Sequence, residues 1–305
     1  MTTWPTGLLT PLVTPLRDDA VDNEALDRLV ESQLAAGVNG IVAGGGTGEF
    51  GALGTDERMS ITESLITLLD GRVPLIVQTG ALATRDSVQL SVAAERAGAT
   101  GLLLASPFGE PITWRERKRF YEDVADAVSL PIMIYNTPPS GLLAFEQIEE
   151  LAKIENITAI KDSSGDMTLL GDLLAKARAE DFHVYVGWDS LALPAVARGA
   201  DGLIIGVANV IAREVTTLLA MRRTSGETDE YAHLAEQLRL FLRFMERSTN
   251  YIALCKFGLR LDGLDVGDPR RPYLLPPDDE LEHFTGRLQE LRSAFSAHAP
   301  DATPR

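Results

Sequence analysis

The stretch Ile157-Thr158-Ala159-Ile160-Lys161 is a short apolar run that ends in a lysine, and the turn sequence Asp162-Ser163-Ser164-Gly165 follows it at once. An almost continuous apolar run of this length is typical of a parallel strand that is covered on both faces. Amphipathic helical patterns flank the run, at Phe145 to Ala152 before it and at Met167 to Ala179 after it. A buried strand between two helices is the repeating unit of an α/β fold.

The same alternation continues in both directions along the chain. Eight apolar runs predict strands, at Leu8 to Pro15, Val38 to Ala43, Pro74 to Gln78, Gly101 to Ala105, Pro131 to Tyr135, Ile157 to Ile160, His183 to Val186 and Gly202 to Ile205. Helical patterns lie between them, among them Asp22 to Ala36, a segment opening at Thr55, Thr84 to Ala97, Thr113 to Val128 and Ser190 to Arg198. Eight such units predict a (β/α)8 TIM barrel, with a doubly wound open sheet as the alternative.

No strand pattern appears after Asn209, and the rest of the chain has the periodicity of helices, interrupted by a segment rich in Gly, Asp and Pro at 262–278. No linker separates independent domains. We therefore expect a catalytic barrel over residues 1–210, a C-terminal helical extension over 211–298 and a disordered tail over 299–305.

The composition excludes several classes of protein. The net charge of -16 argues against sequence-independent binding to nucleic acid or to an anionic membrane. No apolar run is long enough to span a membrane, and no signal peptide is apparent. The single cysteine, Cys255, cannot form an internal disulfide and suits a reducing compartment. These features predict a cytoplasmic protein.

Lys161 is the strongest candidate for a reactive group. Of the five lysines, we expect Lys118, Lys153 and Lys176 to be solvated on helix surfaces, whereas Lys161 extends an apolar run. Burial lowers the pKa of a lysine, and a neutral amine attacks a ketone to form a Schiff base. The alternative is a strand-end lysine whose stem is buried and whose amine reaches solvent.

The ends of the other predicted strands supply further candidates, because the active site of a TIM barrel lies at the C-terminal ends of its strands. The loop Gly44 to Gly48 contains Thr47 and brings backbone N–H groups close to a ligand, unless it is only a tight turn. Tyr135 ends the strand next to that of Lys161. Its phenol is either a proton carrier or a wet cap on the core.

Other chemistries find little support. The four histidines are not spaced as metal ligands, and His183 begins a strand at the end of the barrel remote from chemistry. No serine lies in a nucleophile elbow. We therefore expect no metal and no separate cofactor.

Taken together in order, these motifs resemble the dihydrodipicolinate synthase / N-acetylneuraminate lyase family of class I aldolases over nearly the whole chain. The motifs are Thr14-Pro15, Gly45-Gly46-Thr47-Gly48-Glu49, Tyr135-Asn136-Thr137-Pro138, Ile160-Lys161-Asp162-Ser163-Ser164-Gly165, Gly187-Trp188-Asp189, Gly202-Leu203-Ile204-Ile205-Gly206, and Arg271-Pro272 followed by Pro276. Any one of them alone would be weak evidence, but the set is specific.

The resemblance implies a lyase in which Lys161 forms a Schiff base with pyruvate or another 2-oxo acid. By the same resemblance, Tyr135 is the proton shuttle, Thr47 positions it, the amides of Gly46 and Thr47 bind the α-carboxylate, and the carbonyl of Ile204 lines the site. It also implies a homotetramer built as a dimer of dimers.

Three departures from the family's pattern bear on the substrate. Gly46 stands where dihydrodipicolinate synthases usually carry the first of two threonines, Phe108 stands where they carry an interface tyrosine, and the loop Pro138-Pro139-Ser140-Gly141 lacks their arginine. A charged hydrogen bond of the kind that an arginine makes to a carboxylate contributes about 1.5–3 kcal/mol. These changes put dihydrodipicolinate synthesis in doubt and favour a less acidic aldehyde or a sugar acid.

Asp189 fits a sugar acid, because Trp188-Asp189 resembles the pair that sugar-acid lyases place after the seventh strand, where Asp189 would bind a hydroxyl. Two further functions stay open. One is a barrel that binds a sugar phosphate near Ala200-Asp201-Gly202. The other is a non-catalytic regulatory barrel that binds a 2-oxo acid without turnover.

Overall fold

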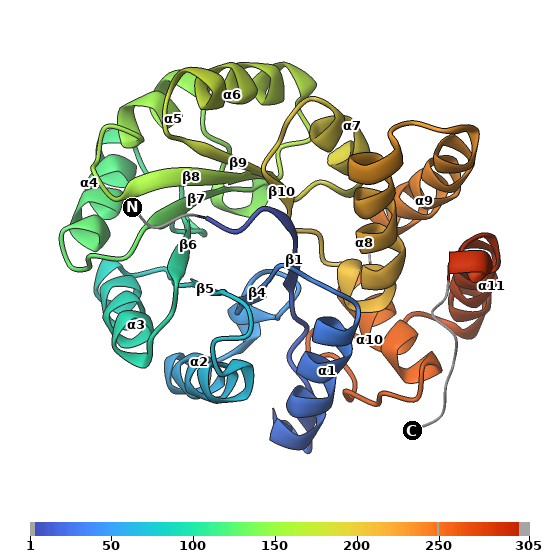
Figure 1. The fold of residues 1–305 in the computed structure, drawn as a ribbon. Coiled ribbons are helices and arrows are strands. Elements are labelled where there is room, and N and C mark those ends of the chain that lie inside the picture. Colours follow the sequence, from blue (N-terminus) through green and yellow to red (C-terminus); the bar gives the residue numbers. More distant parts are fainter. Residues whose placement is uncertain (1–3, 249, 299–305) are drawn as a thin grey trace.

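Eight parallel strands close into a barrel in the computed structural model, which describes residues 4–248 and 250–298 (Figure 1). The strands are β1 (Gly7–Pro11), β4 (Gly40–Ala43), β5 (Leu75–Gln78), β6 (Gly101–Ala105), β7 (Ile132–Asn136), β8 (Ile157–Asp162), β9 (His183–Val186) and β10 (Gly202–Leu203). Their order around the barrel is β1-β10-β9-β8-β7-β6-β5-β4. The predicted TIM barrel is confirmed, and the open sheet is wrong.

A helix follows each barrel strand. The eight are α1 (Asn23–Ala35), α2 (Thr55–Leu69), α3 (Thr84–Ala97), α4 (Trp114–Ala125), α5 (Phe145–Leu151), α6 (Met167–Ala179), α7 (Ala192–Ala197) and α8 (Ala208–Ser225). Local sequence sets several of their ends: Thr113 closes a capping box with Glu116 at the start of α4. Gly98 ends α3 at a positive φ of 100°, which glycine adopts without strain.

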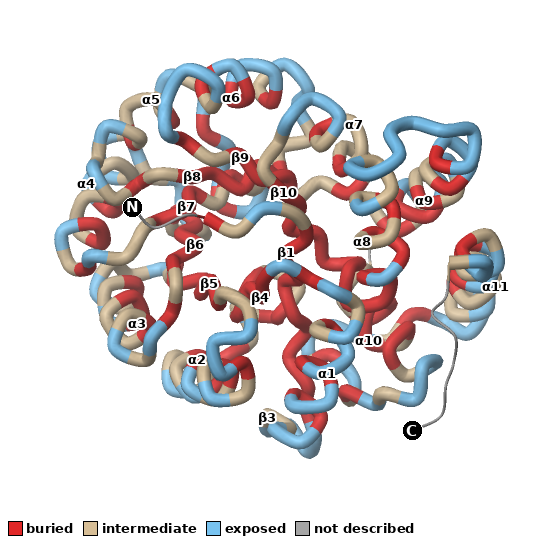
Figure 2. The backbone as a smooth tube through the Cα atoms, viewed as in Figure 1, coloured by how far each residue is buried: buried red, intermediate tan, exposed pale blue. Residues whose placement is uncertain are grey.

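Two layers of apolar side chains fill the fold. One lies between the strands and the helices, and the other fills the barrel interior with Leu9, Val42, Ile76, Leu103, Met133, Ala159, Tyr185 and Ile204. Figure 2 shows the strands buried and the outer turns of the helices exposed. Trp4 closes the base, where its Nε1 donates to Thr158 Oγ1 at 2.9 Å. The interior below the C-terminal strand ends is therefore packed.

Three further helices, α9 (Asp229–Arg247), α10 (Tyr251–Leu261) and α11 (Asp278–Ala294), lie together on one side of the barrel beside α8 (Figure 1). They form the helical extension. The expected boundary at residue 210 falls within α8, so the eighth barrel helix continues past it. The expected tail, 299–305, lies outside the described residues.

Several details differ from expectation. Strand β8 extends through Asp162, so Lys161 lies within the strand rather than after it, and β1 ends at Pro11. A small hairpin, β2 (Leu16–Arg17) with β3 (Ala20–Val21), was not predicted, because two-residue strands carry no periodic signal.

Lys176 is buried rather than solvated: its side chain is 5% exposed and its ammonium pairs with Glu180 at 2.5 Å. The pair and the nearby ring of Phe182 offset the loss of water around the charge.

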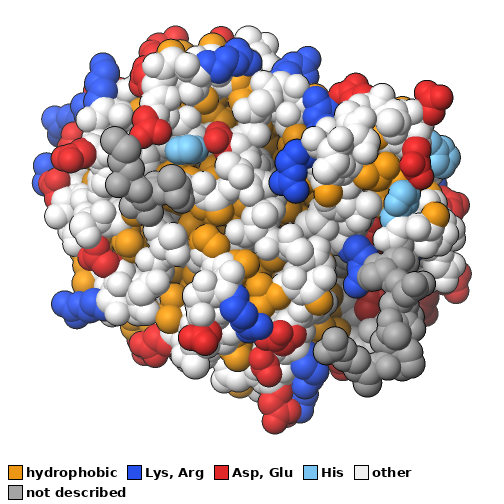
Figure 3. Space-filling view, viewed as in Figure 1, with side chains coloured by type: hydrophobic (Ala, Val, Ile, Leu, Met, Phe, Trp, Pro, Cys, Tyr) orange, Lys and Arg blue, Asp and Glu red, His pale blue; other side chains and the backbone are white. Residues whose placement is uncertain are grey.

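Charged side chains of both signs surround the face of the molecule drawn in Figure 3, and apolar side chains show between them. None of the helices within residues 4–248 and 250–298 is both long enough and apolar enough to cross a membrane.

Candidate active site

Lys161 and Tyr135 lie side by side at the C-terminal end of the barrel. They are register partners on β8 and β7, and each follows an interior residue, Ala159 or Met133, by two positions. Because strand side chains alternate between faces, both point into the barrel. Lys161 Nζ lies 4.2 Å from the centre of the Tyr135 ring, and Lys161 is 4% exposed. The alternative in which this amine reaches solvent is therefore wrong.

The next residues along the two strands fix this register. Asn136 Nδ2 donates to Asp162 Oδ1 at 2.7 Å, and Asn136 Oδ1 accepts from the backbone N–H of Leu143 at 2.9 Å. Asp162 also accepts from Ser164 Oγ at 2.8 Å. These bonds bind the two strand ends to each other and to the loops that follow them.

The phenol of Tyr135 is tuned by its neighbours. Burial by itself would raise the pKa of Tyr135, but the charge of Lys161 and polar contacts to Thr137, Lys161 and Ser163 outweigh burial and lower the pKa. Thr47 is not among these contacts. A phenol with a lowered pKa beside an amine is suited to exchanging protons with a group bound between them.

The glycine-rich loop lies against Tyr135. A Cβ placed on Gly46 would lie 3.7 Å from Tyr135 Oη, and one placed on Gly206 would overlap the Thr47 side chain. The amides of Gly48 and Glu49 donate within the loop, to Gly45 and Gly46 at 3.0 Å each.

By contrast, the amides of Gly46 and Thr47 donate to no other group in the described part of the chain. Two free N–H groups in a loop that adjoins Tyr135 are suited to hold an anion such as a carboxylate.

Gly187 brings the Ile204 carbonyl close to the lysine. A Cβ at Gly187 would overlap both Lys161 Cε and Ser163 Oγ and would lie 3.3 Å from the Ile204 carbonyl oxygen. Only glycine leaves room for this lysine. Ser163 Oγ is buried and faces the Tyr135 phenol, and it makes no closer hydrogen bond within the described residues.

Asp189 is also buried at this end of the barrel, in a short 3₁₀ turn, and is 5% exposed. Burial raises its pKa from 3.8 to about 7; Glu246 adds to this rise, while Tyr251 and Lys161 oppose it. Its Oδ1 has no partner within residues 4–248 and 250–298.

Tyr251, at the start of α10, was not identified from sequence. Its Oη accepts from the Val207 amide at 2.6 Å, and it also contacts Asp189.

The raised pKa of Asp189 predicts a pH-dependent loss of stability. The folded state keeps this proton up to about pH 7, whereas an ordinary Asp loses it near 3.8, so stability falls as pH rises between these values. We expect Asp189→Asn to raise the free energy of unfolding at pH 8 by on the order of 2–4 kcal/mol, and to change it little at pH 4.

Urea denaturation at the two pH values measures this difference. Asp172→Asn, at an exposed position of α6, is the control and should leave the pH dependence unchanged. Equal pH dependence in Asp189→Asn and the unmodified protein would show that Asp189 does not titrate in this way.

The departures expected at the mouth of the site are present. Phe108 packs edge-to-face on Phe50, with ring centres 5.4 Å apart, and offers no hydroxyl. The loop after β7 forms a 3₁₀ turn over Pro138–Ser140. An arginine from a different element does lie beside this loop, because Arg117 of α4 donates to the carbonyl of Gly141 at 3.1 Å.

The alternative phosphate site receives no support. Asp201 precedes β10 and therefore lies at the base of the barrel, away from Lys161. Its carboxylate accepts from the Val184 amide at 2.8 Å and contacts His183 Nδ1 at 2.9 Å. A phosphate would be repelled by this carboxylate.

Among the described residues, no three His, Cys, Asp or Glu side chains gather as metal ligands would.

Comparison with known proteins gives a consistent result. The family model described as "Dihydrodipicolinate synthetase family" matches residues 4–291. A 4-hydroxy-tetrahydrodipicolinate synthase from Bacillus velezensis is 33% identical over 288 residues, which cover 93% of this chain and 99% of that protein.

Solved structures agree. A dihydrodipicolinate synthase from Bacillus anthracis superposes with a TM-score of 0.88 and 29% identity, covering 100% of both chains. YagE, an Escherichia coli K12 prophage protein of the dihydrodipicolinic acid synthase family crystallised with pyruvate, has a TM-score of 0.88 and 27% identity, covering 94% of this chain and 98% of its own.

Proposed function

The chain belongs to the dihydrodipicolinate synthetase family, a family of lyases, and on this premise we propose that Lys161 forms a Schiff base with pyruvate or another 2-oxo acid. One observation carries the proposal. Lys161 is buried, yet no carboxylate pairs with it in the described part of the chain, whereas the buried Lys176 and Lys256 each pair with a glutamate. A buried amine that no carboxylate engages is free to attack the keto carbon of a bound ligand.

The residues around it supply the other parts of the reaction. The free amides of Gly46 and Thr47 would hold the α-carboxylate, which places the keto carbon over Lys161. The amine adds to this carbon to give a carbinolamine, and loss of water then leaves the imine. Tyr135 would donate and accept the protons of both steps, because its phenol adjoins the amine.

The imine draws electrons from the neighbouring carbon. A proton or a carbon substituent can then leave that carbon, and the resulting enamine adds to an aldehyde, is reprotonated, or expels hydroxide from the next carbon as water. Carbon–carbon bond formation or cleavage and dehydration of a sugar acid therefore share the same first steps. Thr47 belongs to the loop that adjoins Tyr135, and its side chain lies against Gly206, which supports a role in shaping this pocket.

The unpartnered polar atoms favour a hydroxylated substrate. Asp189 Oδ1 is buried without a hydrogen-bond partner within the described residues, and Ser163 Oγ is buried with only the Tyr135 phenol near it, whereas buried polar groups are ordinarily satisfied. Hydroxyls of a deoxy sugar acid would satisfy them. The loop after β7 supplies no arginine side chain for a second carboxylate, and the neighbouring Arg117 donates to the Gly141 carbonyl, which together argue against an acidic aldehyde.

Borohydride reduction tests the proposal. The protein is incubated with a panel of 2-oxo acids and deoxy sugar acids, including pyruvate, then reduced and digested. We expect a mass adduct on the peptide that contains Lys161, and we expect a hydroxylated acid to be turned over faster than aspartate semialdehyde with pyruvate. Absence of an adduct on Lys161 with every acid would refute the Schiff base.

Proton exchange distinguishes catalysis from the non-catalytic alternative. A lyase should exchange the methyl protons of pyruvate in deuterated water, whereas a regulatory barrel would bind pyruvate without exchange.

We also propose that the protein is cytoplasmic and assembles as a homotetramer. The mass of the protein in solution tests this assembly.

A further inference from the structure

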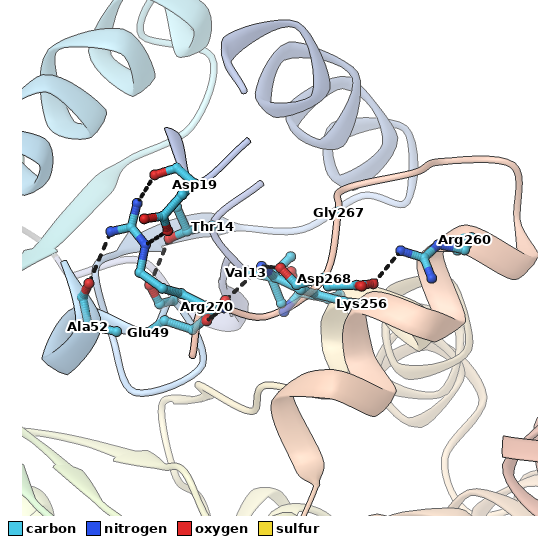
Figure 4. Close-up of polar contacts among 12 residues, drawn as sticks. Val13, Thr14, Asp19, Glu49, Ala52, Lys256, Arg260, Gly267, Asp268 and Arg270 are labelled. Atoms are coloured by element: carbon cyan, nitrogen blue, oxygen red, sulfur yellow. Dashed lines mark hydrogen bonds and ion pairs between the residues drawn. The ribbon is translucent and has the colours of Figure 1, made fainter. Parts of the chain in front are cut away.

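A buried ion pair lies directly behind the glycine-rich loop. Glu49 ends the loop, and its carboxylate meets the ammonium of Lys256 from α10 at 2.7 Å, with both side chains 0% exposed (Figure 4). The two residues are far apart in the chain, and the pair joins the barrel to its C-terminal extension. Neither side chain has a role in the chemistry proposed above.

Further contacts hold both partners in place. Glu49 Oε2 accepts from the backbone N–H of Arg270 at 2.7 Å, and Lys256 Nζ donates to the carbonyl of Asp268 at 3.1 Å. Burying two charges is costly unless such additional bonds satisfy them. The segment that follows α10 therefore completes the pair.

The backbone of Glu49 shows that this position is constrained. Its φ is 60°, in the left-handed region that residues with a side chain seldom adopt. A glycine would relieve that strain, but it would remove the carboxylate. The surrounding contacts hold a strained residue next to the loop, a situation common at functional sites.

The loop is also held on its other sides. Thr14 Oγ1 donates to the carbonyl of Gly48 at 2.7 Å, and the Glu49 amide donates to the carbonyl of Gly46 at 3.0 Å. On the far side, Tyr251 packs on Gly206, which in turn lies against Thr47. Helix α10 thus reaches the loop twice, through Lys256 and through Tyr251.

From this arrangement we infer that Lys256 and Glu49 are positioning residues, which set the loop so that the Gly46 and Thr47 amides point at the 2-oxo acid carboxylate. This inference rests on the proposed function. The side chains of Lys256 and Glu49 themselves are sealed from the site; they act through the backbone of the loop.

Replacing both charges at once separates positioning from stability. Neutral side chains of similar volume can often replace a buried ion pair with little loss of stability, whereas removing one partner leaves an unpaired buried charge. The double variant Glu49→Gln, Lys256→Met in the full-length protein is therefore the main test. Lys176→Met, which removes a buried lysine from its pair with the exposed Glu180 at the end of α6, is the control.

The readouts are the thermal midpoint and the pyruvate concentration that gives half-maximal borohydride trapping on Lys161. In the double variant we expect this concentration to rise about tenfold or more, because small misplacements of binding groups have large effects. The maximal extent of trapping should be retained. Lys176→Met should lower the thermal midpoint and leave the half-maximal concentration within about twofold.

A third variant covers the case in which the double variant does not fold. Lys256→Arg keeps a cation facing Glu49. We therefore expect the Lys256→Arg protein to reach half-maximal trapping at a lower pyruvate concentration than the Lys256→Met protein, even where the two have the same thermal midpoint. A half-maximal concentration that is unchanged in every folded Lys256 or Glu49 variant would overturn the inference. If the unmodified protein forms no adduct at all, the proposed function fails instead, and the two failures are distinct.

Discussion

Replacing Lys161 by methionine is expected to abolish covalent trapping of 2-oxo acids and to lower the rate of pyruvate proton exchange by on the order of 10³-fold or more. Methionine keeps the unbranched stem and removes only the amine. The stem lies against Gly187, a position where a side chain would overlap it. Without the amine no imine forms, so nothing withdraws electrons from the carbon that must lose its proton. Exchange followed by NMR in deuterated water measures the effect.

The control for this experiment is Lys153→Met, which removes an amine from an exposed position. It should trap pyruvate and exchange its protons as the unmodified protein does. Exchange that persists in Lys161→Met at more than about a tenth of the original rate would mean that another group carries out the chemistry.

Replacing Tyr135 by phenylalanine is expected to slow both imine formation and proton exchange by about 10²–10⁴-fold, the usual contribution of a positioned acid or base. The ring would remain beside Lys161, so the packing is kept and only the hydroxyl is lost. Trapping should still reach completion on long incubation, because the nucleophile is intact. The initial rate of adduct formation at saturating pyruvate measures the change.

Tyr185 provides a matched control for the loss of a phenol. It also points into the barrel, but its hydroxyl donates to the Pro5 carbonyl at 2.6 Å, near the base. Tyr185→Phe should therefore reduce stability and leave the trapping rate within about threefold. A Tyr135→Phe protein that is as fast as Tyr185→Phe would remove Tyr135 from the mechanism.

The barrel and its central pair could be predicted because their signals are local. Runs such as Ile157 to Ile160 are apolar throughout, and Lys161 and Tyr135 stand at the ends of consecutive runs. Parallel strands bring such ends together at one edge, so adjacency in space followed from order in the chain. The register of β7 and β8 then places the two residues opposite each other.

The residues contributed by the extension could not be found in this way. Tyr251 reaches the site, and Lys256 the loop behind it, only because α10 packs beside α8, and no local pattern encodes that packing. One signal was present: Lys256 interrupts the apolar stretch Ile252 to Leu259, as Lys161 ends another. Lys176 was misjudged for a similar reason, since a polar neighbourhood in sequence does not reveal burial by tertiary contacts.

The closure of the barrel base by Trp4 determines from which end a ligand can enter and leave the barrel. Because packed side chains fill the barrel below Lys161, a ligand can approach and leave its amine only past the C-terminal ends of the strands. A product must leave by that route before the next substrate can reach the amine of Lys161. On the proposed function, product release and substrate entry therefore use the same route, and a product that dissociates slowly delays binding of the next substrate.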